Sequence, residues 1–150
     1  MIRREKMGDR FRALTGCQKT ESQLIGELGQ LLDQPSTALT RQTLLAILNR
    51  LLDNLPLHLE LASYGGYLTE VRRLRPNWQQ QVKELLGANV RCLAALHELF
   101  DHIRHESPSR TIDTTECGEI EIWIRSVKSI REHECRLLQG AFTIDVGGEA

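Results

Sequence analysis

The sequence of 150 residues has few aromatic residues, few prolines and almost no net charge. Aromatic residues make up 5% of the chain, prolines number 4, and the formal net charge is −1. A nearly neutral chain gives no electrostatic basis for binding nucleic acid. No run reaches the roughly 20 apolar residues of a membrane span, and no apolar block near the N-terminus suggests a secretory signal. We therefore expect a cytoplasmic protein without a nucleic-acid or membrane partner.

Sequence motifs for covalent catalysis and for phosphate binding are also lacking. The chain has no G-x-S-x-G motif and no glycine-rich phosphate loop. The 4 cysteines form no CxxC pair, and none has an evident base partner. Without an export signal we expect them to be reduced, small and mostly buried. They are Cys17, Cys92, Cys117 and Cys135.

What the chain does have is apolar residues at helical spacing, with no strand-like alternation anywhere. Four such stretches occupy about 15–34, 37–74, 77–105 and 113–141, and proline-containing connectors separate the first three and lead into the fourth. Residues 1–14 form a basic segment that we expect to fray, and residues 15–150 form one domain. Four amphipathic helices with short connectors predict an all-α, up-down-up-down four-helix bundle.

Local signals refine the helix boundaries. Capping-box spacing predicts helix starts at Thr15, at Asn77 and at Asp113 with Glu116. The pair Gly65-Gly66 would ordinarily break a helix, but apolar spacing resumes after it. We therefore predict a weak point within one long second helix.

Each apolar stripe carries one polar residue near its middle: Glu21, His58, Asn89 and Glu134. Mid-helix positions fall at similar heights in a bundle, so these side chains are expected to share one layer. Two carboxylates, an imidazole and an amide could hold a single divalent ion such as iron, zinc or manganese. Alternatively, Glu134 and protonated His58 form a buried ion pair within a hydrogen-bonded network, the commoner outcome in helical cores. The sequence leaves both alternatives open.

Three segments resemble the hemerythrin-like (HHE cation-binding) family. The first is His58-Leu-Glu-Leu-Ala-Ser-Tyr-Gly-Gly-Tyr67, the second is the helix that opens after Pro76 and continues through Val82 and Leu85-Leu86, and the third runs from Glu134 to Gly148. The resemblance implies a four-helix bundle in which histidines and carboxylates from all four helices hold a pair of iron ions.

Most of the ligands that this resemblance implies are replaced. His58 matches a helix-two histidine, and Glu134 matches the glutamate of a helix-four His-x-x-x-Glu motif. The remaining expected ligand positions carry other residues: Glu21 near the helix-one histidine, Ala62 for a glutamate, Ser63 for a second acid, Asn89 for the helix-three histidine and Ile130 for the helix-four histidine. Only His58 and Glu134 are therefore of the expected ligand type, and two ligands cannot hold two iron ions.

The interpretation that follows is a degenerate dinuclear iron site in a non-catalytic binding or regulatory module. Its partner would be an unknown protein or small molecule, and no cofactor is expected. One alternative is a remodelled site for a single divalent metal ion that uses His58, Glu134, Asn89 and Glu21. Another is a di-iron oxygen-binding or peroxide-handling protein.

Overall fold

The chain is helical over almost all the residues that the structure describes. A computed structural model describes residues 2–34, 38–63, 66–106 and 111–143. The helices are α1 (Ile2–Leu32), α2 (Ala38–Ala62), α3 (Tyr67–Leu74), α4 (Gln79–His105) and α5 (Thr114–Leu138). A 3₁₀ turn (Pro76–Trp78) precedes α4, and a π-helical turn (Gln139–Thr143) follows α5. Because the described residues include no strand, the predicted all-α class is confirmed.

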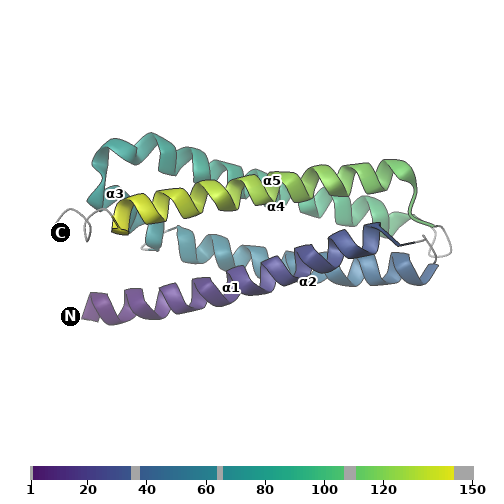
Figure 1. Ribbon diagram of the computed structural model, residues 1–150, viewed down its shortest axis with the longest axis horizontal. Helices are drawn as coiled ribbons and strands as arrows, with labels where there is room; N and C mark the ends of the chain where they lie inside the picture. Colours follow the sequence, from purple (N-terminus) through teal and green to yellow (C-terminus); the bar gives the residue numbers. More distant parts are fainter. Residues whose placement is uncertain (1, 35–37, 64–65, 107–110, 144–150) are drawn as a thin grey trace.

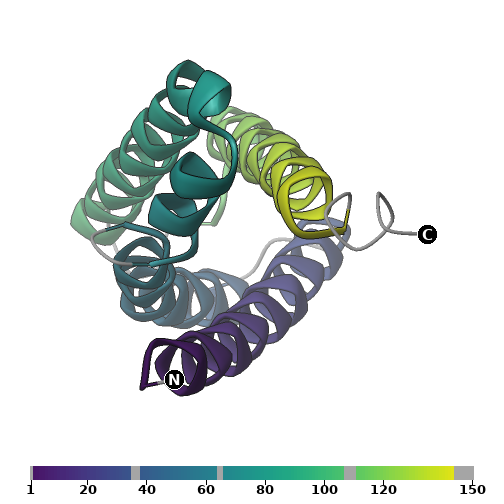
Figure 2. The same cartoon turned by 90° about the vertical axis from the view of Figure 1, so that its left-hand side faces the viewer.

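The four long helices pack side by side as a bundle (Figure 1). Seen from one end, they surround a shared interior (Figure 2). Helix α1 packs on α2, α2 on α4, and α4 on α5, while α5 also meets α1. The short helix α3 covers one end of the bundle and contacts α1, α2 and α4. None of the described helices combines the length and the apolar character that a membrane span requires.

The interior consists of two apolar clusters with a polar layer between them. Every long helix passes from one cluster to the other and contributes inward apolar side chains to both, as its helical spacing requires. The larger cluster includes Leu24, Leu28, Leu48, Leu51, Leu96, Ile120, Trp123 and Val127. The smaller includes Leu14, Ala62, Tyr67, Leu68, Val71, Val82, Leu85, Leu137 and Ala141. The polar layer therefore lies in the middle of the molecule with apolar packing on both sides.

Two of the three predicted helix starts are wrong and one is confirmed. Asp113 caps α5 as predicted. Its side chain accepts a hydrogen bond from the Glu116 backbone N–H at 2.7 Å, and the Glu116 side chain accepts one from the Asp113 backbone N–H at 3.1 Å. Asn77 lies within the 3₁₀ turn instead, and α4 begins after Trp78 without a side-chain cap. Thr15 lies inside α1, which begins at Ile2. Residues 2–14 include four arginines and one each of glutamate, lysine, methionine, alanine and leucine, all of which have high helix propensity.

The predicted long second helix is divided into α2 and α3 near Gly66. Gly66 has an ordinary extended backbone conformation, with φ −83° and ψ −168°, and precedes the first residue of α3. A Cβ at this position would overlap the carbonyl oxygen of Leu61 and lie 2.6 Å from that of Ser63. The chain folds back too closely here for any side chain, so the position just before α3 requires a glycine. Two predicted connectors lie outside the described residues, the one near 34–36 in part and the one at 107–110 entirely. The end of the chain from Ile144 also lies outside them.

Candidate functional site

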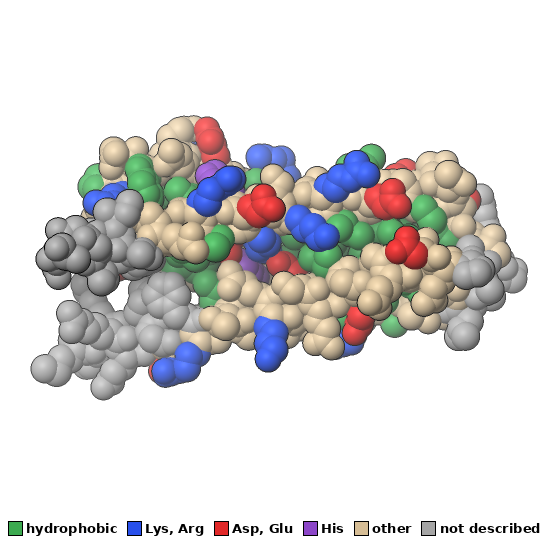
Figure 3. Space-filling model, viewed as in Figure 1, with side chains coloured by type: hydrophobic (Ala, Val, Ile, Leu, Met, Phe, Trp, Pro, Cys, Tyr) green, Lys and Arg blue, Asp and Glu red, His purple; other side chains and the backbone are tan. Residues whose placement is uncertain are grey.

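The four polar residues predicted to share a layer do so. Glu21 on α1, His58 on α2, Asn89 on α4 and Glu134 on α5 are all buried, with exposed fractions between 0% and 6%. They come together midway along the bundle, between its two apolar clusters. In the space-filling view, acidic, basic and histidine atoms are visible in the seam between α1 and α5 (Figure 3). We refer to these residues together with Arg131 as the polar layer.

His58 and Glu134 are in direct hydrogen-bond contact, as the hydrogen-bonded alternative expects. Nε2 of His58 lies 2.9 Å from Oε1 of Glu134 and 3.0 Å from Oε2. A carboxylate can only accept, so this nitrogen carries the hydrogen and donates it. Nε2–H donation to Glu134 is therefore a fixed feature of the site, whether the ring is neutral or charged.

The centre of the polar layer is Arg131, a residue that the sequence reasoning missed. Its guanidinium binds Glu21 in bidentate fashion, with Nε 2.7 Å from Oε2 and Nη2 2.8 Å from Oε1. Nη1 donates to Oδ1 of Asn89 at 2.6 Å and to Oε2 of Glu134 at 3.3 Å. One side chain thus links α1, α4 and α5, and through Glu134 it also connects to His58 on α2. Such planar, charge-assisted bonds are the stronger class of hydrogen bond.

Two amides complete the hydrogen bonding of the layer. The Asn89 amide nitrogen donates to the Leu85 carbonyl of its own helix at 2.9 Å, which leaves its oxygen facing Arg131. Gln18 donates to Oε1 of Glu134 at 3.1 Å. Each carboxylate therefore receives several donors, as a buried anion requires.

The pKa shifts follow from this geometry. Burial alone would raise the pKa of Glu134, but the hydrogen bond and charge of His58 and the charge of Arg131 together lower it. Burial alone would lower the pKa of Arg131, but its hydrogen bonds to Glu21 and the Glu21 charge raise this pKa above its usual value. Burial and the neighbouring Glu134 charge raise the pKa of the Tyr67 hydroxyl. Glu134 is therefore a carboxylate and Arg131 a cation throughout the physiological range. The formal charges of the layer sum to zero when His58 is protonated.

Two buried polar atoms beside the layer have no hydrogen-bond partner among the described residues. They are Nδ1 of His58 and the hydroxyl of Tyr67. Leaving such groups unpaired is costly.

The donor set does not fit a dinuclear iron centre. Both oxygens of Glu21 accept from Arg131, and both oxygens of Glu134 accept from His58. The Asn89 oxygen also accepts from Arg131. Within the described residues, no group of three or more His, Cys, Asp or Glu side chains is arranged to hold a metal ion. The positive charge among these carboxylates comes from a guanidinium.

A second buried ion pair lies near the end of α4 and the start of α5, and the sequence did not predict it either. Arg41, a fully buried side chain on α2, binds Glu116 at 2.8 Å and the carbonyl of Ile103 at 3.1 Å. It also donates to the Thr111 carbonyl at 3.0 Å, which ties α2 to the segment before α5.

A sequence signal existed for Arg41, which lies three residues before Leu44 on the inward row of α2. Arg131 follows Ile130 at the edge of the inward row of α5, where helical spacing alone gives no such signal.

Comparison with known proteins identifies no relative of this chain. No protein-family model matches the chain, and no curated protein or solved structure matches it significantly.

Proposed function

We propose that this chain is a hemerythrin-like four-helix bundle whose metal centre has degenerated, and that it acts as a non-catalytic binding or regulatory module. The observation that carries the proposal is the position of Arg131. Its guanidinium contacts Glu21, Asn89 and Glu134 at once. A metal ion held by these side chains would have to displace a cation that already satisfies them.

The residues at the other expected ligand positions support the same proposal. Ala62, where the family resemblance implies a glutamate, is completely buried in the smaller apolar cluster. Ile130, where it implies a histidine, packs against both apolar clusters. These positions contribute to apolar packing, and neither side chain can bind a metal.

The arrangement of the helices supports the up-down-up-down topology that the proposal includes. Neighbouring long helices are consecutive in the chain, apart from the short helix α3. The start of α1 and the end of α5 lie at the same end of the molecule (Figure 1). Short connectors between antiparallel neighbours are typical of such bundles.

A remodelled site for a single divalent ion is the second candidate, and one observation favours it. His58 keeps a buried nitrogen, Nδ1, that has no partner in the described structure, and the unpaired Tyr67 hydroxyl is likewise buried. Imidazole nitrogen is a common ligand for zinc and iron. This candidate requires Glu134, Glu21 or Asn89 to leave its present hydrogen bonds when the metal binds.

Thermal unfolding with added metal separates the two candidates. Wild-type protein, freed of metal and then titrated with zinc, manganese or ferrous ion, is expected to keep the same melting temperature. An increase of more than about 5 °C that His58→Ala abolishes would overturn the proposal in favour of the single-ion site. His97→Ala, which removes an exposed histidine, is the matched control for adventitious surface binding.

The di-iron alternative has its own readout. Aerobic loading with ferrous iron is expected to produce no near-ultraviolet or visible absorption band from protein-bound iron. A stable band at two iron ions per chain would show that the dinuclear centre still assembles and would overturn the proposal.

A further inference from the structure

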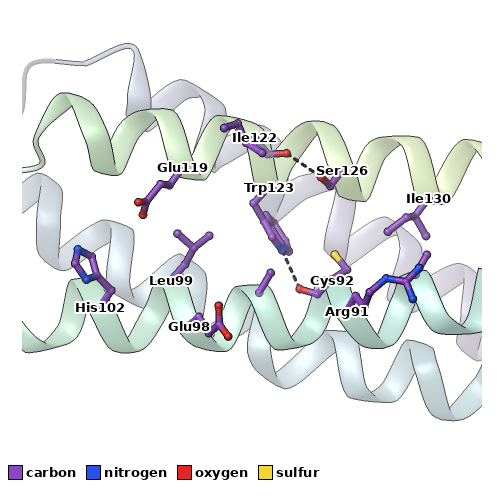
Figure 4. Close-up of a pocket in the computed structure, with 12 residues that line it drawn as sticks. Arg91, Cys92, Glu98, Leu99, His102, Glu119, Ile122, Trp123, Ser126 and Ile130 are labelled. Atoms are coloured by element: carbon purple, nitrogen blue, oxygen red, sulfur yellow. Dashed lines mark hydrogen bonds between the residues drawn. The ribbon is translucent and has the colours of Figure 1, made fainter.

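A groove of about 710 Å³ runs along the outside of the bundle between α4 and α5. It lies on the far side of these helices from α1 and α2 and is separate from the hydrogen bonds of the polar layer. Figure 4 shows its lining residues projecting from the two helices towards the groove. The groove is open to solvent, so a protein surface can enter it as well as a small molecule.

The middle of the groove is apolar. Trp123 forms part of its floor and is held there by a 3.0 Å hydrogen bond from its indole nitrogen to the Cys92 carbonyl (Figure 4). Beside it, Ile122 projects outwards with 62% of its surface exposed, the highest value among the large apolar residues of the described chain. An exposed apolar side chain beside an apolar groove is typical of an interaction surface.

The charges of the groove are divided between its two ends. Arg91 lies at one end, whereas Glu119 and Glu98 lie on the other side of Trp123, towards His102 (Figure 4). Within the described residues, none of Arg91, Glu98 and Glu119 forms an ion pair. The groove therefore presents an unpaired cation at one end and unpaired anions at the other.

We propose that this groove is the contact surface of a homodimer, in which two copies pair antiparallel about a twofold axis near Trp123. In that arrangement Arg91 meets Glu119 of the partner subunit, and the same contact is repeated on the other side of the axis. Ile122 of each copy enters the apolar middle of the other groove. A second copy is the occupant that this charge pattern fits, because a twofold axis brings opposite ends of the same groove together.

The inference goes beyond the proposed function, because it names what the binding surface takes. It does not depend on whether the polar layer holds a metal. The metal titrations described above and the association measurements that follow therefore succeed or fail independently.

Sedimentation velocity over a concentration series tests the proposal with the full chain. Wild-type protein is expected to show a reversible monomer–dimer equilibrium with a dissociation constant of about 1–100 μM, as small polar-rimmed interfaces give. Ile122→Glu is expected to weaken the dimer by at least about tenfold. Leu57→Glu is the matched control, because Leu57 is also exposed, at 53%, and does not line the groove. It should leave the dissociation constant unchanged.

Charge reversal supplies a test that only self-pairing can pass. Arg91→Glu alone and Glu119→Arg alone are each expected to weaken the dimer by about tenfold or more, because like charges then face each other twice. A mixture of the two variants restores opposite charges at both contacts and is expected to form a heterodimer of near wild-type affinity. Circular dichroism of each variant establishes that the helices are intact.

Three results would overturn the proposal. One is a wild-type protein that stays monomeric at about 100 μM, which would leave the groove to a different partner or to a small ligand. Another is a dimer that Ile122→Glu leaves intact, which would place the interface on another face. The last is a mixture of the charge variants that associates no better than either variant alone.

Discussion

Replacing Arg131 with methionine is expected to lower the free energy of unfolding by about 2–4 kcal/mol. Removing one partner of a buried ion pair costs roughly 3–5 kcal/mol, because it strands the other charge. Here the variant would strand Glu21, whose side chain is 3% exposed, and would remove donors from Asn89 and Glu134. The Arg131 side chain is itself 16% exposed, so water can replace part of what is lost, and we reduce the expected cost accordingly.

Urea denaturation followed by circular dichroism at the helical band measures this cost. For a chain of this length, about 2–4 kcal/mol corresponds to a fall in melting temperature of roughly 4–16 °C. Arg125→Met is the matched control, since Arg125 is an exposed arginine of the same helix and should change stability by less than about 0.5 kcal/mol. Arg131→Lys keeps the charge but loses the bidentate geometry, so we expect an intermediate loss.

A double variant identifies the source of the loss. If the stranded Glu21 carboxylate dominates, then Glu21→Gln combined with Arg131→Met should cost clearly less than the two single changes added together. A loss below about 0.5 kcal/mol for Arg131→Met, or full additivity of the two changes, would refute the idea that the guanidinium organises the polar layer.

Three further predictions concern other parts of the molecule. The pKa of Glu134 is lowered in the folded state, so its ionisation stabilises the fold above the pKa of an unfolded glutamate, and this stability is lost as the pH falls through the folded-state pKa. Glu134→Gln should therefore flatten the profile of stability against pH on the acid side of the unfolded-state pKa, and an unchanged acid profile would count against this. Gly66→Ala should lower the free energy of unfolding, measured by chemical denaturation, by at least about 2 kcal/mol, because the alanine Cβ would overlap the Leu61 carbonyl. A loss of less than about 0.5 kcal/mol, the scale of an ordinary surface change, would contradict the close approach. Burial raises the pKa of the Cys92 thiol to about 11, so peptide mass spectrometry after iodoacetamide treatment should find exposed Cys135 modified far faster, and equal rates would contradict this.

Much of the polar layer could be predicted from residue spacing, because helical periodicity fixes which side chains face inwards. The inward rows placed Glu21, His58, Asn89 and Glu134 at similar heights, and the structure brings all four together. The same spacing suggested that His58 would pair with Glu134, which it does at 2.9 Å. Periodicity was sufficient here because each of these residues lies on the inward apolar row of its helix.

Arg131 could not be predicted in the same way, because it lies beside the stripe rather than on it. Counting by helical turns assigned the inward position to Ile130 and left Arg131 at the polar edge. A long side chain can nevertheless reach sideways into a core and place its charged end far from its own Cα. Whether it does so depends on acceptors from other helices, here Glu21 and Asn89, which no local pattern reveals.

The helix break at Gly66 was missed for a related reason. Local spacing favours one continuous helix, since Leu68 and Val71 resume the apolar row. The glycine is required by a tertiary event, the return of the chain against the Leu61 carbonyl. Close approach of two backbone segments leaves no periodic signal beyond the glycine itself.

The metal content of protein purified without chelator tests most directly whether a guanidinium has replaced the metal centre. Elemental analysis is expected to find less than about 0.1 equivalents each of iron, zinc and manganese per chain, because the oxygens of Glu21 and Glu134 are already bonded to Arg131 and His58. One or two equivalents of any of these metals that survive dialysis would contradict the proposal.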